Sequence, residues 1–120
     1  MSDERPRYIF HLAPAERWHS WPAHTPYLPA EYAADGFVHC TAGEALMLAV
    51  ANRFYGGTPG PYLLITLDAE RLDAPLRWED SGDDLAPQFP HLYGAIPREA
   101  VVAVREAVRA PDGTFQRWGE

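Results

Sequence analysis

Three histidines, His11, His39 and His91, each stand within a short apolar segment that has the composition of a β-strand. An imidazole in such surroundings needs a partner for each of its ring nitrogens. One histidine of this kind is usually structural, but three in a chain of 120 residues favour a shared site. Because imidazole exchanges a proton near neutral pH, the pattern predicts a pocket with three catalytic histidines. His19 and His24 lie in a polar, proline-rich stretch and are predicted to be surface residues.

The segment GFVHCT, residues 36–41, joins a predicted strand to a predicted helix. Thr41 and Glu44 have the spacing of a capping box, which predicts that the helix begins beside His39. The free N–H groups of a helix start suit a phosphate or a carboxylate. Thr41 is therefore a candidate substrate-binding residue, although a cap is needed there whatever the function.

The segment FPHLYG, residues 89–94, sets a histidine between a proline and an aromatic residue. Rigid loops that display such side chains are typical of binding sites, so His91 and Tyr93 are both candidates. The alternative is that Phe89, Leu92 and Tyr93 simply fill the core.

Arg53 and Glu79 are the charged candidates for substrate binding. Arg53 lies at the edge of the predicted helix, where it suits a phosphate or carboxylate, or an exposed ion pair. Glu79 ends a predicted strand, where a carboxylate can stabilise positive charge on a sugar or act as a base. Pairing with Arg77 or Arg98 is the structural alternative for Glu79.

Two further chemistries have weaker support. Cys40 lies next to the predicted helix start, which would lower the pKa of its thiol and favour a nucleophile. Strand alternation, however, points Cys40 away from His39. A zinc site built on the three histidines is geometrically possible, but their separations of 28 and 52 residues are not those of a local ligand motif. No metal is therefore predicted, and the three-histidine site stays an alternative.

The elements that must position these residues are short and irregularly spaced. A helix is expected after the capping box, because Met47, Val50, Ala51 and Phe54 repeat at the spacing of one buried face. A shorter helix should begin near Pro14. The remaining apolar stretches predict strands over residues 8–12, 36–40, 62–67, 76–79, 101–108 and 114–118, with a loop or irregular strand over 89–94.

This order lacks the regular alternation of a parallel α/β protein. It predicts one α+β domain over residues 1–120, with a curved or split, largely antiparallel sheet and two or three helices. Walker, Rossmann, nucleophile-elbow and Cys-x-x-Cys motifs are all missing, which argues against several common enzyme classes.

Composition narrows the partners and the compartment. Ten basic residues, all arginine, face seventeen acidic ones, and the net charge of −7 argues against binding to long nucleic acid. No apolar run approaches the roughly 20 residues that a membrane helix needs. The N-terminal segment is charged and is not followed by the apolar stretch that a signal peptide has. A single cysteine fits a reducing compartment, so a cytoplasmic location is expected.

In the order IFHLA, DGFVHCT, ANRFY, LLITLD, APLRWED, FPHLYGAIP and AVVAV, the chain resembles the bacterial domain-of-unknown-function family 952 (DUF952). The resemblance runs from about residue 8 to residue 104. Its most specific part is the combination of GF-[IV]-HC-[ST] with FPH-[LI]-YG.

The resemblance implies an ADP-ribosyltransferase-like fold, whose members use NAD or ADP-ribosylated substrates. On that basis His11 resembles the first-strand histidine that bonds a ribose hydroxyl, and His39 occupies the second-strand position. The third position is Glu79 or the loop of His91 and Tyr93. Because a clear late-strand glutamate is missing, a hydrolase or phosphotransferase relative, or an inactive binder, stays open.

The leading hypothesis is an enzyme that acts on NAD or an ADP-ribose-like nucleotide by cleavage at the anomeric carbon. NAD would be a substrate here, and the partner a small nucleotide-like molecule. The alternatives are a non-catalytic nucleotide-binding module, a three-histidine metal-dependent hydrolase and an interaction domain with structural histidines.

Overall fold

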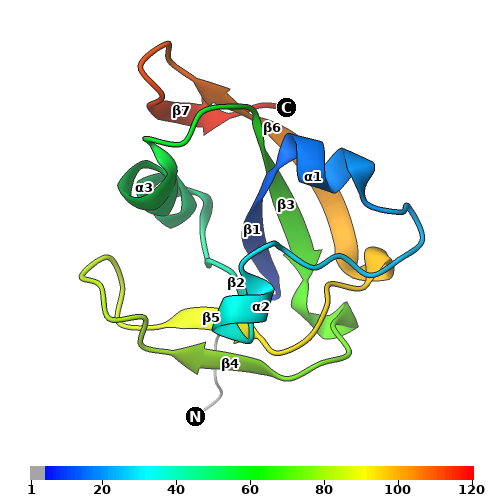
Figure 1. Cartoon of the computed structure of the whole chain (residues 1–120). Helices are drawn as coiled ribbons and strands as arrows, with labels where there is room; N and C mark the ends of the chain where they lie inside the picture. Colours follow the sequence, from blue (N-terminus) through cyan, green and yellow to red (C-terminus); the bar gives the residue numbers. More distant parts are fainter. Residues whose placement is uncertain (1–4) are drawn as a thin grey trace.

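The apolar run YLLITLD forms the central strand of the larger sheet in a computed structural model that describes residues 5–120 (Figure 1). This strand, β3 (Tyr62–Asp68), pairs antiparallel with β1 (Tyr8–Pro14) and with β6 (Val101–Arg109). β7 (Phe115–Trp118) pairs with β6 and completes the order β1-β3-β6-β7. A strand that is apolar on both faces needs cover on both faces, and β3 is buried along almost its whole length.

A second sheet of three short strands carries two of the histidines. β5 (Phe89–Leu92) lies between β2 (Val38–His39) and β4 (Leu76–Glu79), and both pairings are antiparallel. His39 lies directly opposite His91 in the β2–β5 register. The segment expected as a loop or irregular strand is therefore the central strand of this sheet.

A short antiparallel bridge connects the two sheets. The N–H of Phe10 donates to the carbonyl of Thr41, and the N–H of Thr41 donates to the carbonyl of Phe10, both at 2.8 Å. The sheet is thus split and largely antiparallel, so the predicted single α+β domain is confirmed.

Three α-helices and two short 3₁₀ turns complete the described chain. α3 packs against β1 and β7 of the larger sheet, while α2 lies over the small sheet (Figure 1). None of the helices among residues 5–120 is long and apolar enough to cross a bilayer. The bounds are α1 (Ala15–Ser20), α2 (Tyr32–Asp35), α3 (Glu44–Tyr55), η1 (Ala69–Arg71) and η2 (Arg98–Ala100).

The start of α3 differs from the prediction. The helix begins at Glu44 after Gly43, whose φ of 98° suits glycine, and no side chain caps it. The predicted capping box of Thr41 and Glu44 is therefore wrong, because the backbone of Thr41 is committed to the bridge with Phe10. The helix start also lies farther along the chain from His39 than expected.

The buried face of α3 is narrower than its pattern indicated. Met47 and Ala51 are buried, but Phe54 is 53% exposed. The predicted burial of Phe54 is wrong because β7 covers only one side of the helix, and Trp118 donates from its indole nitrogen to the Glu44 carbonyl there. Phe54 is left on the opposite edge, facing the small sheet.

Two apolar clusters lie on either side of the larger sheet. The side chains of β1 alternate between them, with Ile9 and Ala13 in one and Phe10 and Leu12 in the other. The first cluster also receives Leu92 from β5, so the small sheet is anchored to the core through the strand that bears His91.

Candidate functional site

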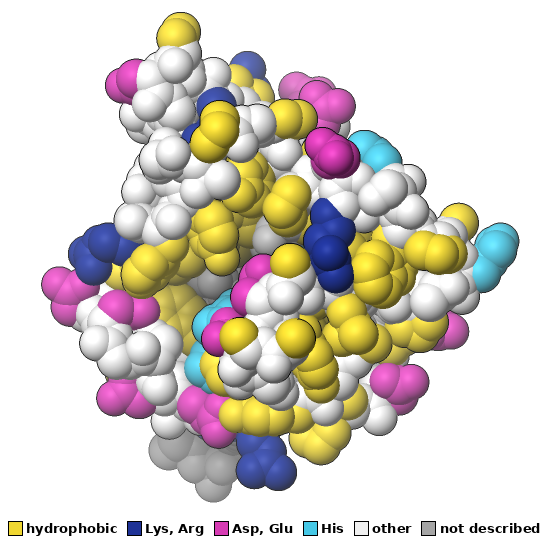
Figure 2. Space-filling model, viewed as in Figure 1, with side chains coloured by type: hydrophobic (Ala, Val, Ile, Leu, Met, Phe, Trp, Pro, Cys, Tyr) yellow, Lys and Arg dark blue, Asp and Glu magenta, His cyan; other side chains and the backbone are white. Residues whose placement is uncertain are grey.

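A cleft of about 440 Å³ opens between α2, α3 and the small sheet. Figure 2 shows histidine and acidic side chains gathered beside hydrophobic ones in this hollow. We call it the histidine cleft. It is lined by polar residues (Glu31, Asp35, His39, Thr41, Ser81, Asp83 and His91) and by Cys40, Val50, Phe54, Tyr55 and Phe89.

His91 is held in one orientation by a contact with the half-buried carboxylate of Glu79. Its Nδ1–H donates to Oε1 of Glu79 at 2.9 Å, and the hydroxyl of Tyr93 donates to the same oxygen at 2.6 Å. These bonds, from Tyr93 first and His91 second, hold the pKa of Glu79 below its usual value. Since an ionised carboxylate only accepts, the proton of neutral His91 lies on Nδ1 and its Nε2 carries a lone pair.

The other ring nitrogen of His91 is unused. The residue is 4% exposed, and Nε2 is buried with no hydrogen-bond partner among the described residues. The ring of Phe37 stacks on the imidazole, with centroids 4.1 Å apart and planes 21° apart. Buried polar atoms are nearly always bonded, so this nitrogen is ready to accept from a group at the cleft.

His39 stands at the open side of the cleft. Its Nε2–H donates to Oδ2 of Asp35 at 2.8 Å, and its side chain is 44% exposed. Asp35 is the last residue of α2, and Gly36 with φ 81° ends that helix and turns the chain into β2. The contact leaves the lone pair on Nδ1 of His39, on an imidazole that solvent can reach.

The Asp35–His39 pair and the Glu79–His91 pair, which we call the two dyads, face one another across strands β2 and β5. The ring centroids of His39 and His91 are 5.5 Å apart, because the two residues are directly opposite in the β2–β5 register. Each imidazole has its own carboxylate, Asp35 or Glu79. Two histidines oriented in this way can serve as a general base and as a hydrogen-bonding anchor for one small ligand.

His11 does not reach the cleft. It is 2% exposed on β1, and its Nδ1–H donates to the carbonyl of His39 at 2.8 Å. Burial lowers the pKa of His11, so the ring is neutral at neutral pH. Its Nε2 has no partner among the described residues, but it lies in the core near Tyr27, with ring centroids 6.1 Å apart. His11 thus supports the backbone of His39 instead of touching a ligand.

The remaining predicted residues divide between the cleft and its surroundings. Thr41 lines the cleft, whereas Tyr93 contacts Glu79 and is not among the lining residues. Arg53 forms an ion pair with Asp84 at 3.1 Å, with both side chains exposed, and does not line the cleft. Glu79 forms its ion pair with His91 and not with Arg77 or Arg98, the predicted structural alternatives.

The thiol and metal hypotheses do not agree with the geometry. Cys40 lines the cleft but is 2% exposed, and burial raises the pKa of its thiol to about 12. The expected lowering is wrong because the helix start lies beyond the cysteine, at Glu44. Among residues 5–120 no three His, Cys, Asp or Glu side chains form a group able to hold a metal ion. The nitrogen that His11 would offer is in the core, so the three-histidine metal site is not formed.

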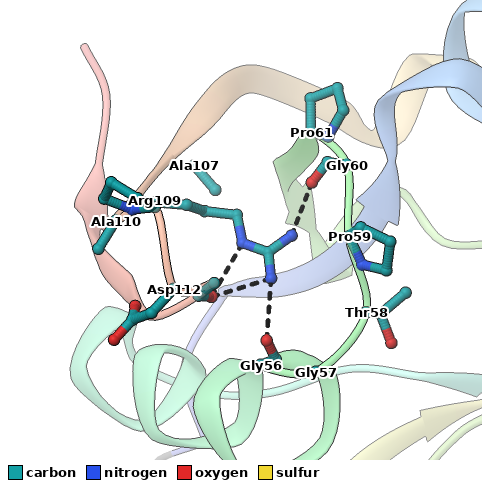
Figure 3. A pocket seen from close by; sticks show the side chains of 12 residues that line it. Gly56, Gly57, Thr58, Pro59, Gly60, Pro61, Ala107, Arg109, Ala110 and Asp112 are labelled. Atoms are coloured by element: carbon teal, nitrogen blue, oxygen red, sulfur yellow. Dashed lines mark hydrogen bonds between the residues drawn. The ribbon is translucent and has the colours of Figure 1, made fainter.

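A second hollow, of about 500 Å³, lies beyond the C-terminal end of α3, along the loop that follows the helix (Figure 3). We call it the arginine hollow; it is lined by residues 56–61, Ala107 and residues 109–113. Arg109 fills its centre and donates to the carbonyls of Tyr55, Gly56, Gly60 and Gly113. These bonds engage all three guanidinium nitrogens, so Arg109 fastens the loops together.

Sequence reasoning did not single out Asp35, Phe37 or Asp83. Asp35 and His39 are four residues apart, but the glycine and strand between them give no helical signal. Phe37 contacts His39, with ring centroids 4.6 Å apart, through the local course of the chain at β2. Asp83 lies in the segment between β4 and β5, whose position beside the cleft only the fold determines.

Comparison with known proteins places the chain among relatives of similar architecture. The family model described as "Protein of unknown function (DUF952)" matches residues 12–104. The crystal structure of protein CC0527 from Caulobacter crescentus is 27% identical, with a TM-score of 0.76, and the match covers 91% of this chain and 93% of that one. The solution NMR structure of CC0527 is also 27% identical, with a TM-score of 0.73 and coverage of 92% and 93%.

No curated protein matches the chain. The names of the matched structures identify no activity, so the ADP-ribosyltransferase-like grouping stays a prediction. The family model spans most of the chain, including both dyad histidines and their carboxylates. The chain therefore belongs to the DUF952 family, the identification that its GFVHCT and FPHLYG segments suggested.

Proposed function

We propose that the histidine cleft binds an NAD-like N-ribosyl compound and cleaves the bond between its ribose and its nicotinamide. One observation carries the proposal: two imidazoles, each oriented by a carboxylate, lie 5.5 Å apart at a single acidic cleft. NAD is the substrate in this hypothesis, and the chain supplies the proton acceptor, the anchor and the negative charge.

The bond between the anomeric carbon and the pyridinium nitrogen breaks first, and its electron pair stays with neutral nicotinamide. The positive charge then rests on the ribose, as an oxocarbenium-like state, where the cleft carboxylates Glu31, Asp35 and Asp83 favour it. Water adds to that carbon, and Nδ1 of His39 takes the proton that the water loses. NAD and water thus give nicotinamide, ADP-ribose and one proton.

His91 has the role of an anchor in this scheme. Its Nε2 accepts a hydrogen bond from a ribose hydroxyl, which satisfies a buried nitrogen that has no partner among the described residues. The stacked Phe37 and the Glu79 carboxylate keep the ring from turning. Binding the sugar at a fixed ring lowers the entropic part of the barrier.

Binding without turnover is the second candidate, and the state of Glu79 favours it. This carboxylate accepts from both His91 and Tyr93, so it is not free to face the anomeric carbon. A module of this kind would keep the ligand in the same cleft and release no nicotinamide.

The proposal is tested by incubating the protein with NAD and measuring nicotinamide release, with calorimetry for binding. We expect His39→Ala to lower the release rate by about 100-fold, a usual contribution of general base catalysis. His19→Ala is the matched control, because His19 is exposed outside the cleft. Binding of NAD without release would favour the binding module. No binding of NAD or ADP-ribose, and no effect of either variant, would contradict both candidates.

A further inference from the structure

We infer that the histidine cleft selects its ligand by positive charge, so that it takes a cationic N-ribosyl pyridinium nucleoside and keeps phosphate groups outside. The inference rests on the proposed function and names the part of the substrate that the cleft recognises. It follows from the charges, the aromatic rings and the unpaired nitrogen of the cleft.

The charge of the cleft is negative. Glu31, Asp35 and Asp83 line it, and among the described residues that do so none is an arginine. Hydrogen bonds from the Ser81 hydroxyl and the Leu85 N–H hold the pKa of Asp83 below its usual value, so it is ionised at neutral pH. A phosphate brought among these carboxylates is repelled, whereas a pyridinium cation is attracted.

Arg53 does not cancel this charge. It acts electrostatically on Asp83, but it is paired with Asp84, and both side chains of that pair are exposed to solvent and do not line the cleft. A diphosphate is therefore better placed outside the cleft, where water and this arginine surround it, than inside it.

Part of the cleft lining is aromatic. Phe54 and Tyr55 from α3 and Phe89 from β5 line the cleft, and Phe54 is half exposed. Aromatic faces attract cations, most strongly when water is displaced. Aromatic rings and carboxylates in the lining of one cleft are the combination that recognises a flat organic cation.

Nε2 of His91 supplies the independent observation. It is a buried acceptor without a partner, on a residue that lines the cleft, and so it calls for a ligand that donates. The ribose hydroxyls and the carboxamide N–H of a nicotinamide nucleoside donate, but a deprotonated phosphate only accepts. The volume of about 440 Å³ lies in the range of small-molecule sites and suits a nucleoside, while a dinucleotide extends beyond it.

Calorimetry with four ligands tests the inference on the intact chain: nicotinamide riboside, its reduced dihydro form, NAD and ADP-ribose. The oxidised and reduced ribosides differ little in shape, but only the oxidised form is cationic. We expect the cation to bind about 10-fold more tightly than the reduced form and than ADP-ribose, and we expect added salt to narrow the gap.

Two variants tie the preference to the cleft. Asp83→Asn is expected to weaken binding of the cation by about 5-fold and to strengthen binding of ADP-ribose. Asp73→Asn, which removes one exposed carboxylate outside the cleft, is the matched control and should change neither. If Asp83→Asn lowers the melting temperature, Glu31→Gln is used for the same test, because Glu31 lines the cleft and directly precedes α2.

The outcomes separate this inference from the proposed function. ADP-ribose or the reduced riboside binding as tightly as the cation would overturn charge selection, while nicotinamide release sensitive to His39→Ala would leave the proposed function standing. Failure of all four ligands to bind would overturn both.

Discussion

The histidine cleft and the arginine hollow have similar volumes, about 440 and 500 Å³, but their polar groups are used differently. In the arginine hollow the guanidinium of Arg109 donates to four backbone carbonyls, and its Cζ lies 4.2 Å from the centre of the Phe115 ring. In the histidine cleft one nitrogen of His91 has no partner among the described residues, and His39 is open to solvent. A hollow whose arginine binds its own loops is structural, whereas one whose lining includes a histidine with an unpaired nitrogen is suited to a ligand.

The two regions also differ in what holds them. The arginine hollow joins the loop after α3 to the β6–β7 turn, and one side chain connects them. The histidine cleft collects its walls from α2, β2, α3 and the β4–β5 segment, and the carboxylate contacts inside it orient rings instead of tying loops. Substitutions should therefore affect stability in the first region and ligand chemistry in the second.

The largest expected effect is on stability, at Arg109. Arg109→Ala leaves carbonyls of the two loops without their donor, and we expect it to lower the free energy of unfolding by about 3 kcal/mol. Urea unfolding followed by circular dichroism measures this. Arg109→Lys keeps the charge but cannot reach carbonyls on both sides, so it should recover only part of the loss.

Ligand binding at the histidine cleft should survive the same substitution. A loss of NAD binding in folded Arg109→Ala, with stability unchanged, would reverse the assignment of the two hollows.

Much of the fold followed from local patterns in the sequence. The apolar stretches over residues 8–12 and 62–67 both became strands of the larger sheet, where β3 lies between β1 and β6. The predictions that were wrong concerned features that depend on long-range contacts. Thr41 has the right neighbours in sequence for a helix cap, but its backbone N–H and carbonyl are hydrogen-bonded to Phe10, thirty-one residues earlier.

The site was less predictable, for a related reason. Its histidines and Glu79 could be chosen by residue type, but the pairing of Glu79 with His91 and of Asp35 with His39 could not. The first contact depends on how β4 pairs with β5, and the second on the turn at Gly36, and neither is visible in the chain itself. Equally, nothing local shows that His11 faces the core and not the cleft.

His11 gives the second prediction, a pH dependence of stability. Burial lowers the pKa of His11 in the folded state. Below pH 6.5, His11 therefore binds a proton in the unfolded chain but stays neutral in the folded chain. The contribution of neutral His11 to the free energy of unfolding is complete above pH 6.5. It is lost as the pH falls, at up to about 1.4 kcal/mol per pH unit. Urea unfolding at several values between pH 5 and 7 measures the slope.

His11→Gln should flatten that slope, and His24→Gln, outside the core, should keep it. A slope that stays the same in His11→Gln would mean that other groups cause it.

Tyr93 is a positioning residue in this scheme, and its loss should have a moderate effect on activity. Tyr93→Phe removes the first of the two bonds that lower the pKa of Glu79, so that pKa rises toward its ordinary value. The carboxylate then protonates at a higher pH and releases His91 sooner. We expect nicotinamide release to fall by about 10-fold, with the acid limb of its pH profile moved upward.

A purely structural Tyr93 would lower the melting temperature without moving the acid limb. Tyr32→Phe, a tyrosine of α2 that does not line the cleft, is the control for the loss of one hydroxyl.

The smallest expected effect is at Phe54, where the helical pattern and the structure disagree. If the pattern were right, Phe54→Ala would remove a core side chain and cost about 3–5 kcal/mol. With half of its surface in water and its ring at the histidine cleft, we expect less than about 1 kcal/mol of lost stability and a several-fold weaker binding of nicotinamide riboside. Met47→Ala, from the same helix but buried, should show the reverse, with a large loss of stability and unchanged binding by the protein that stays folded. The two positions are seven residues apart on one helix, so opposite outcomes would reflect what each side chain contacts, which is the larger sheet for Met47 and, in the proposed function, the ligand for Phe54.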